Sequence, residues 1–244
     1  MRSFRKIKNN LLILVSVIGL AFAGCNISDL GLFGTSDNVK VYDKNDRSIP
    51  VDIKDVPKYR GIPYVEINNN KPSFSDKDKD RVEEYSKLDK LGRCGPAFAN
   101  VCKELMPTGP RESIRDVRPS GWHTVKYDDI LEDRYLYNRC HLIAFMLAGE
   151  NANERNLITG TRYFNVEGML PFEIQVADYV KSTGNHVLYR VRPIFKGNDL
   201  VARGVQMEAQ SVEDGGEGIS FNVYCYNVQP GIRTVSYTHL RAHE

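Results

Sequence analysis

Hydrophobic and polar residues alternate in three segments near the end of the chain, residues 186–195, 200–209 and 219–226. Alternation with a period of two is typical of β-strands that bury one face. Short runs rich in Gly, Asn and Asp, at 197–199 and 214–216, separate the segments and favour tight turns. The pattern therefore predicts an antiparallel β-meander.

Two segments have the apolar spacing of helices. Residues 96–106 are apolar at positions 98, 101 and 105, which predicts a helix there. Residues 161–179 predict a second helix, with Gly168 and Pro171 marking a break and Gly184 a plausible end.

A third pattern lies between the two predicted helices. Residues 122–127 are strand-like, 128–133 form an acidic turn, and the chain is extended again from Tyr135. Two strands followed by a polar crossing and the helix at 161–179 give a β-β-α unit. With an extended segment at 61–66, the whole pattern predicts an α+β fold, an antiparallel sheet core with the β-β-α unit packed against it.

The N-terminus has the pattern of a targeting segment. Basic residues precede an apolar run, 11–22, that is too short to span a bilayer. Small residues followed by Cys25 are typical of a lipoprotein signal, in which Cys25 is lipidated and anchors the protein to a membrane surface. The alternative is an ordinary secretory signal cleaved near Ala23. Both interpretations imply export.

The remaining composition divides the chain into segments. Residues 1–24 are the predicted signal peptide, and the polar residues 25–56 read as a tether. Residues 57–232 are long enough for one sizeable core. The end of the chain, 233–244, resembles a translated sequencing-adapter read, so it is expected to be non-native and is excluded from site reasoning.

Charge and cysteine content limit the possible partners and cofactors. Without the four basic residues of the signal, 29 basic residues remain against 31 acidic ones, so a polyanion site must be a local cluster of Arg and Lys. Cys94, Cys102, Cys140 and Cys225 allow three disulfide pairings, or all four are small buried side chains. No Cys-x-x-Cys pair occurs, which disfavours zinc.

The residues with the clearest chemistry lie between 135 and 173. Arg139 and His141 are two apart on a predicted strand and so face the same side. Imidazole can take a proton from water near neutral pH, and a guanidinium beside it can hold a phosphate. Asn165 offers a carbonyl oxygen to a hard cation such as Mg²⁺. Glu173 follows eight residues later, about 80° away on an ideal helix, and could reach a water of that cation.

These residues carry a family resemblance. The sequence Asn138-Arg139-Cys140-His141 resembles the Asp-Arg-Gly-His signature of the DNA/RNA non-specific endonuclease family, the ββα-metal or His-Me finger nucleases. Arg139 and His141 match the signature, whereas Asn138 and Cys140 depart from it. The departure removes a charge beside the histidine and adds a side chain where the family has none, so we expect a divergent branch.

The order and spacing of His141, Asn156, Asn165 and Glu173 also resemble the family pattern. The resemblance implies that His141 activates water, that Mg²⁺ (with Mn²⁺ as a substitute) on Asn165 stabilises the phosphorane and the leaving 3′ oxygen, and that Arg139 holds the phosphate. Asn156 either fixes the preceding loop or holds Asn165.

The implied substrates are the backbones of DNA and RNA, cleaved with little sequence preference to give 5′ phosphates. Arg155 and Arg162 are either phosphate contacts or ordinary surface charges. The resulting hypothesis is an exported, membrane-anchored, metal-dependent nuclease with its catalytic domain at 57–232. One alternative is a catalytically weak or inactive lipoprotein that keeps the nuclease fold as a module for binding nucleic acid or protein. Another is a secreted toxin or effector nuclease.

Overall fold

The computed structural model describes residues 50–126 and 135–232 of the 244-residue chain. The predicted signal peptide with Cys25, the acidic turn at 128–133 and the predicted tail lie outside these residues. Within them, no helix is long and apolar enough to cross a membrane. The elements are β1 (Tyr64–Glu66), η2 (Asn68–Asn70), η3 (Asp76–Asp80), β2 (Glu83–Tyr85), β3 (Ala97–Val101), β4 (Tyr137–His141), α2 (Phe145–Ala148), η4 (Glu154–Asn156), β5 (Leu157–Thr161), η5 (Phe164–Met169), α3 (Leu170–Thr183), β6 (Val187–Ile194), β7 (Gly204–Ser211) and β8 (Ser220–Tyr226).

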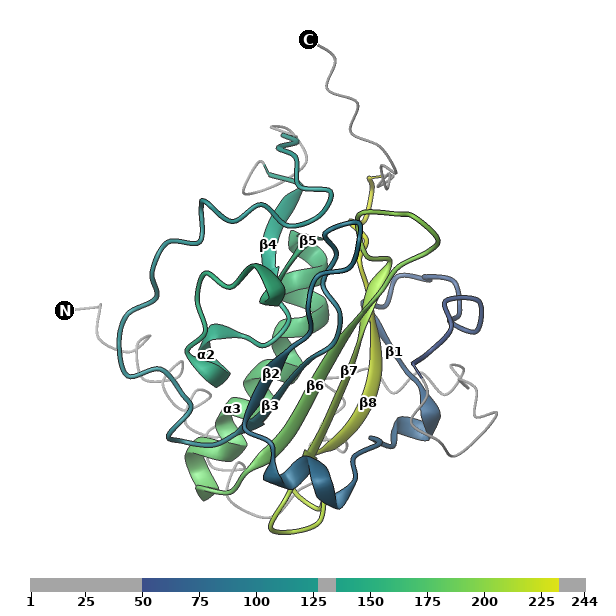
Figure 1. The fold of residues 1–244 in the computed structure, drawn as a ribbon. Coiled ribbons are helices and arrows are strands. Elements are labelled where there is room, and N and C mark those ends of the chain that lie inside the picture. The colour runs from purple at the N-terminus through teal and green to yellow at the C-terminus, as the bar shows by residue number, and fades with distance from the viewer. Residues whose placement is uncertain (1–49, 127–134, 233–244) are drawn as a thin grey trace, which may run out of the picture. The chain divides into compact units, whose positions relative to one another are not determined.

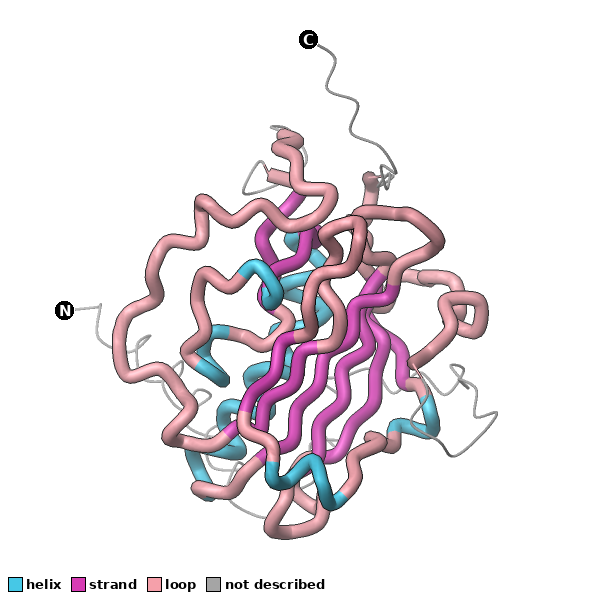
Figure 2. Tube along the Cα trace, viewed as in Figure 1, coloured by secondary structure: helices cyan, strands magenta, loops and turns pink. Residues whose placement is uncertain are grey.

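Two antiparallel sheets organise these elements (Figures 1 and 2). The larger has six strands in the order β1-β8-β7-β6-β3-β2, and the smaller pairs β4 with β5. The centre of the larger sheet is the predicted meander, since β6, β7 and β8 follow one another in sequence and in space. The α+β fold class with an antiparallel sheet core is thus confirmed.

The main core lies between the large sheet and α3, which runs along one face of it (Figure 1). Alternate residues of β6, β7 and β8 point into this layer, as the sequence alternation predicts. The buried side chains include Val187, Tyr189, Val191, Val205, Met207, Ala209, Phe221 and Val223 from the strands and Val176, Ala177 and Val180 from α3.

The opposite face of the sheet carries a buried polar group beside a small apolar cluster, and both are covered by the N-terminal part of the described chain. Glu208 on β7 is completely buried, and it accepts hydrogen bonds from Arg190 at 2.9 Å and from the Ser73 hydroxyl at 2.6 Å. Nearby, Val51 and Ile53 pack against a small cluster on the same sheet. The folded part therefore extends into the segment 50–56, the end of the predicted tether, because its apolar residues cover strand side chains.

The predicted helix at 96–106 is wrong, since Ala97–Val101 form strand β3. Ala97, Ala99 and Val101 face the core, while Phe98 on the other face packs under the Arg81 guanidinium at 4.0 Å. Phe98 is buried as well as the three core-facing residues, so apolar residues occupy both faces and only the half-buried Asn100 interrupts them. Such a run does not distinguish a buried strand from a helix.

The predicted strand pair of the β-β-α unit is also wrong in its first member. Residues 122–126 contribute only one isolated bridge, Lys126 to Tyr135. The strand containing His141 pairs instead with Leu157–Thr161, with Arg139 opposite Thr159 and His141 opposite Leu157. All five residues of β5 are buried, so the segment lacks the alternation that marks a strand.

The helix after β5 begins with a π-helical turn rather than a break. The Leu170 N–H donates to the Asn165 carbonyl, five residues earlier, and α3 continues from there. Pro171 lies in the first turn of α3, where its missing N–H costs little. Gly184, with φ of 78°, ends the helix as predicted, and its N–H donates to the Val180 carbonyl at 2.9 Å.

The four cysteines of the described residues are free thiols. Cys94, Cys140 and Cys225 are buried in the core, and Cys102 is half-buried. This agrees with the interpretation of the cysteines as small side chains and not as disulfide partners.

Candidate active site

Strand β4 ends at His141, whose ring lies between two groups of opposite hydrogen-bonding character. Its Nε2 is 2.8 Å from the Asn151 carbonyl oxygen, and its Nδ1 is 3.3 Å from Nη2 of Arg111. A carbonyl only accepts hydrogen bonds and a guanidinium only donates them. The two contacts therefore select the same neutral tautomer, with the proton on Nε2 and the lone pair on Nδ1.

The surroundings of His141 keep it uncharged. Its side chain is only 7% exposed. Burial is the main cause that lowers the pKa of His141, to about 4. The hydrogen bond to the Asn151 carbonyl opposes this shift, and the positive charge of Arg111 adds to it. At neutral pH the ring is therefore neutral and can accept a proton.

Asn156 holds the chain where it leaves β4. Its side-chain oxygen accepts the Ile143 N–H at 2.8 Å, and its amide donates to the Ile143 carbonyl at 2.9 Å. Its own backbone carbonyl accepts the Leu142 N–H at 2.8 Å. Asn156 is completely buried, so these bonds fix the position of the residues directly after His141.

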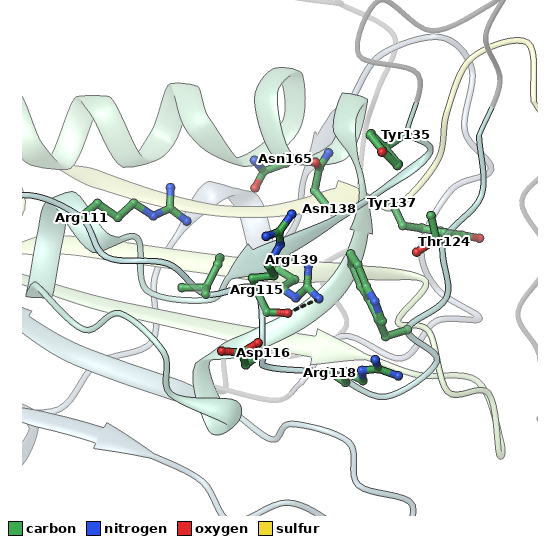
Figure 3. Close-up of a pocket in the computed structure, with 12 residues that line it drawn as sticks. Arg111, Arg115, Asp116, Arg118, Thr124, Tyr135, Tyr137, Asn138, Arg139 and Asn165 are labelled. Carbon is green, nitrogen blue, oxygen red and sulfur yellow. Dashed lines mark hydrogen bonds between the residues drawn. The ribbon is translucent and has the colours of Figure 1, made fainter.

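A pocket of about 900 Å³ lies beside this strand (Figure 3). Its lining combines four arginines, two asparagines, one carboxylate and three aromatic rings. They are Arg111, Arg115, Arg118, Arg139, Asn138, Asn165, Asp116, Trp122, Tyr135 and Tyr137, with Ile114 and Thr124. The arginines give the pocket the local positive charge that a polyanion requires, although the whole chain is nearly neutral.

Arg111 joins His141 to this pocket. His141 is not itself a lining residue, but Arg111 both lines the pocket and contacts its Nδ1. Asn165 lines the same pocket from the π-helical turn η5, and Figure 3 shows it between Arg111 and Asn138 in that view. Arg111 thus contacts His141 and lines the pocket that Asn165 also lines.

Arg139 lines the pocket but already has several partners. Its Nε donates to the Val117 carbonyl at 2.5 Å and its Nη2 to the Arg115 carbonyl at 2.6 Å. Its guanidinium also stacks on Trp122, with Cζ 3.9 Å from the ring centroid. Arg139 therefore anchors the loop that carries Arg115 and Arg118.

Glu173 lies in the first turn of α3 and is not a pocket-lining residue. Its side chain is 6% exposed, and burial raises its pKa to about 8, although the nearby Arg111 charge opposes the shift. Asn138 lines the pocket, and its Nδ2 is buried without a hydrogen-bond partner among the described residues. Arg155 and Arg162, in contrast, are not pocket-lining residues.

Three arginines of the pocket, Arg111, Arg115 and Arg118, were not predicted as site residues from the sequence. The segment that carries them reads as a polar surface loop, and only the density of arginines, three in eight residues, marks it as more than that. Their convergence depends on Arg139, because its bonds bring residues 115–117 back to β4.

The lining suits a hydrated hard cation better than zinc. Among the described residues no group of three or more His, Cys, Asp and Glu side chains could hold a metal. The pocket instead presents the amide oxygen of Asn165 and the carboxylate of Asp116. Mg²⁺ takes oxygen ligands, keeps several waters and often uses one or two protein groups, so this donor set fits it.

The mixed fold with its mostly antiparallel sheet is that of a ββα-metal nuclease. The model of the DNA/RNA non-specific endonuclease family matches residues 72–213, more than half of the chain, so the chain belongs to this family. The predicted resemblance is therefore confirmed, and the protein is a DNA/RNA non-specific endonuclease.

Solved structures agree with this assignment. Magnesium-bound NucA from Streptococcus agalactiae is 27% identical with a TM-score of 0.59, and the match covers 68% of this chain and 80% of NucA. The Sda1 nuclease with bound zinc is 25% identical with a TM-score of 0.58, covering 69% of this chain and 92% of Sda1. No curated protein sequence matches the chain.

Proposed function

We propose that this endonuclease hydrolyses the phosphodiester bonds of both DNA and RNA with a divalent cation, Mg²⁺ or Mn²⁺ as its substitute, and that His141 is its general base. The observation that carries the proposal is the link made by Arg111. It joins Nδ1 of His141 to the pocket that Asn165 and three other arginines line.

His141 is prepared for one proton transfer. The Asn151 carbonyl occupies its Nε2–H, so Nδ1 is the atom that takes a proton from the attacking water. As the water oxygen bonds to phosphorus, the bond from phosphorus to the 3′ oxygen breaks, and the leaving 3′ oxygen takes a proton from a solvent water. The products carry a 5′ phosphate and a 3′ hydroxyl.

Asn165 is the proposed protein ligand of the cation. When bound, Mg²⁺ supplies positive charge to the phosphate oxygens and the leaving oxygen. The unpartnered Nδ2 of Asn138 and the carboxyl group of Glu173 are the groups that would orient water around Asn165. The magnesium and zinc in the NucA and Sda1 structures support a divalent cation at such a site.

The arginines are the proposed phosphate contacts. Arg111, Arg115 and Arg118 belong to one loop, and Arg139 faces them from β4. Guanidinium groups bind phosphate oxygens in pairs of hydrogen bonds, and such backbone contacts carry no direct sequence information. Arg155 and Arg162 would serve, at most, as contacts beyond the pocket.

Export and anchoring complete the proposal. Cys25 follows an apolar segment and small residues, which supports cleavage before it and lipidation of its thiol. The domain would then act at the outer surface of a membrane.

Degradation assays test the catalytic part. The protein is incubated with plasmid DNA and with RNA, in Mg²⁺ or in EDTA, and loss of both substrates only with metal is expected. His141→Ala and Asn165→Ala should each lower the rate by a factor of about 10² or more, since each removes a proposed catalytic group. His186→Ala is the matched control, because His186 lies outside the pocket and is paired with Glu213. Normal cleavage by His141→Ala would refute the assignment of the base.

A further inference from the structure

The segment from residue 135 to 179 contains four tyrosines, at 135, 137, 163 and 179, and we compared each as a ring on which a base could stack. They differ in their surroundings. Tyr137 is 5% exposed and packs edge-on against His123. Tyr163 and Tyr179 do not line the pocket, and their hydroxyls contact Tyr59 and Asp214. Tyr135 lines the pocket and is 45% exposed, so its ring is accessible from the substrate side.

Tyr135 is held in place although its ring is exposed. Its backbone forms the isolated bridge with Lys126, and the next residue, Leu136, donates its N–H to the Val125 carbonyl at 3.0 Å. The Lys126 ammonium lies 5.3 Å from the ring centroid. These contacts restrict the ring before any ligand binds, which lowers the entropy cost of stacking on it.

Trp122, another large ring of the pocket, has a cation closer to its face than Tyr135 has, at 3.9 Å from the ring centroid against 5.3 Å. Trp122 carries the Arg139 guanidinium on its face. Figure 3 shows Tyr135 at the end of the pocket away from Arg111, with Asn138 and Asn165 between them in that view. A nucleotide whose phosphate is bound by the arginines would therefore meet Tyr135 at one side of the site.

A ring beside a cluster of cations is the arrangement that binds single strands. Cations follow the phosphates, and aromatic rings stack on successive bases whatever their identity. A base inside a duplex presents only its edge in a groove, because its faces are covered by neighbouring base pairs. The face of Tyr135 can therefore be used only by a base that has left the stack.

We infer that Tyr135 is a stacking platform for one unstacked base, and that single-stranded or locally opened nucleic acid is the preferred substrate class of this site. The inference rests on the proposed function, because it assumes that the arginine-lined pocket binds the phosphate to be cleaved. Tyr135 then sets specificity for strand state and not for sequence.

An abasic scan tests the inference. A 5′-labelled single-stranded oligonucleotide with one stable abasic residue is partly digested in Mg²⁺, and the products are resolved at single-nucleotide resolution. The wild-type enzyme should show reduced cleavage at one fixed offset from the abasic residue, by roughly 5- to 150-fold. Tyr135→Ala should remove this minimum, and Tyr135→Phe, which keeps the ring, should retain it.

Two results would overturn the inference, namely a wild-type ladder without a minimum, or the same minimum in Tyr135→Ala. A binding measurement separates this failure from failure of the proposed chemistry. Fluorescence anisotropy with His141→Ala compares the intact and abasic oligonucleotides without cleavage. The platform is supported, even if no hydrolysis occurs, when His141→Ala binds the abasic strand more weakly than the intact strand and this difference disappears in the double variant with Tyr135→Ala. Equal binding of both strands by His141→Ala contradicts the platform.

Discussion

The Nδ1 atom of His141 lies 3.3 Å from Nη2 of Arg111, so the lone pair of the proposed base faces a cation that also lines the pocket. An incoming phosphate is a stronger partner for a guanidinium than a neutral imidazole is. Substrate binding would therefore draw Arg111 toward the phosphate and leave Nδ1 to the attacking water. In this arrangement Arg111 would couple phosphate binding to exposure of the His141 Nδ1 lone pair.

The first prediction concerns the acid limb of the pH profile. His141 must be neutral to act as a base, so kcat/KM should be constant above its pKa of about 4 and fall as the pH drops through that value. Arg111→Gln removes a charge that lowers the pKa, and the limb should move to higher pH. The measurement is kcat/KM against pH at constant ionic strength.

This test depends on the pH at which kcat/KM falls, and not on the absolute value of kcat/KM. Arg111→Gln also removes a proposed phosphate contact and is expected to be slower at every pH. Arg118→Gln is the control, because Arg118 lines the pocket without a hydrogen bond to His141. An unchanged limb in Arg111→Gln would show that burial alone sets the pKa.

The second prediction concerns the stability cost of Glu173. Burial raises its pKa from 4.5 to about 8, so between these values the folded protein holds a proton that the unfolded chain has lost. The free energy of unfolding should therefore fall as the pH rises from 4.5 to 8, by about 1.4 kcal/mol per pH unit. Glu173→Gln has no such proton to lose, and should be more stable than the wild type by on the order of 3 kcal/mol at pH 7.

Urea unfolding in EDTA at pH 5, 6, 7 and 8 measures this difference. Glu167→Gln provides the control, since Glu167 is an exposed carboxylate on the adjoining turn η5. The gap between Glu173→Gln and the wild type should widen with pH, while the Glu167→Gln curve stays parallel. A constant gap would mean that Glu173 is ionised in the folded protein across this range.

Local sequence patterns predicted the parts of the fold that depend on neighbours in the chain. The meander β6-β7-β8 and the Gly184 helix end follow from alternation and from glycine's freedom at positive φ. The helix predicted at 96–106 failed because β3 is buried on both faces and has no alternation to read. Pairing of β4 with β5 was missed for the same reason.

Some residues of the candidate site were likewise predicted from the sequence, and others were not. The motif located Arg139 and His141, whose spacing places them on one strand. It did not locate Arg111, whose approach to His141 spans 30 residues and is a property of the folded chain. Nor did the sequence indicate that Arg139 would bond to the carbonyls of Arg115 and Val117, so its role as an anchor required the structure.

The third prediction concerns that anchor. Arg139→Lys keeps the charge but cannot reach two carbonyls and stack on Trp122 together. The loop bearing Arg115 and Arg118 should loosen, and KM should rise more than kcat falls. Limited proteolysis should show faster cleavage within residues 111–120. A fall in kcat with an unchanged KM and unchanged proteolysis would instead place Arg139 at the reacting phosphate only.

The fourth prediction concerns the departure from the family signature at Cys140. The Cys140 side chain is completely buried, and it lies where a Cβ on Gly160 would be 2.6 Å from its sulfur and 2.6 Å from Phe164 Cδ1. Gly160 pairs with Asn138 across the two strands, and its missing side chain leaves room for the nearby Cys140 sulfur. Gly160→Ala should destabilise the protein by about 1–3 kcal/mol through overpacking.

A double-mutant cycle identifies the partner of Gly160. Cys140→Ala alone leaves a small void and should cost about 1 kcal/mol. Combined with Gly160→Ala it should cost less than the sum of the two single changes, because removing the sulfur relieves one of the two clashes. Phe164 remains, so the rescue should be partial. Strict additivity in chemical denaturation would show that Phe164 alone limits the space, and that the cysteine in the motif is accommodated without help from Gly160.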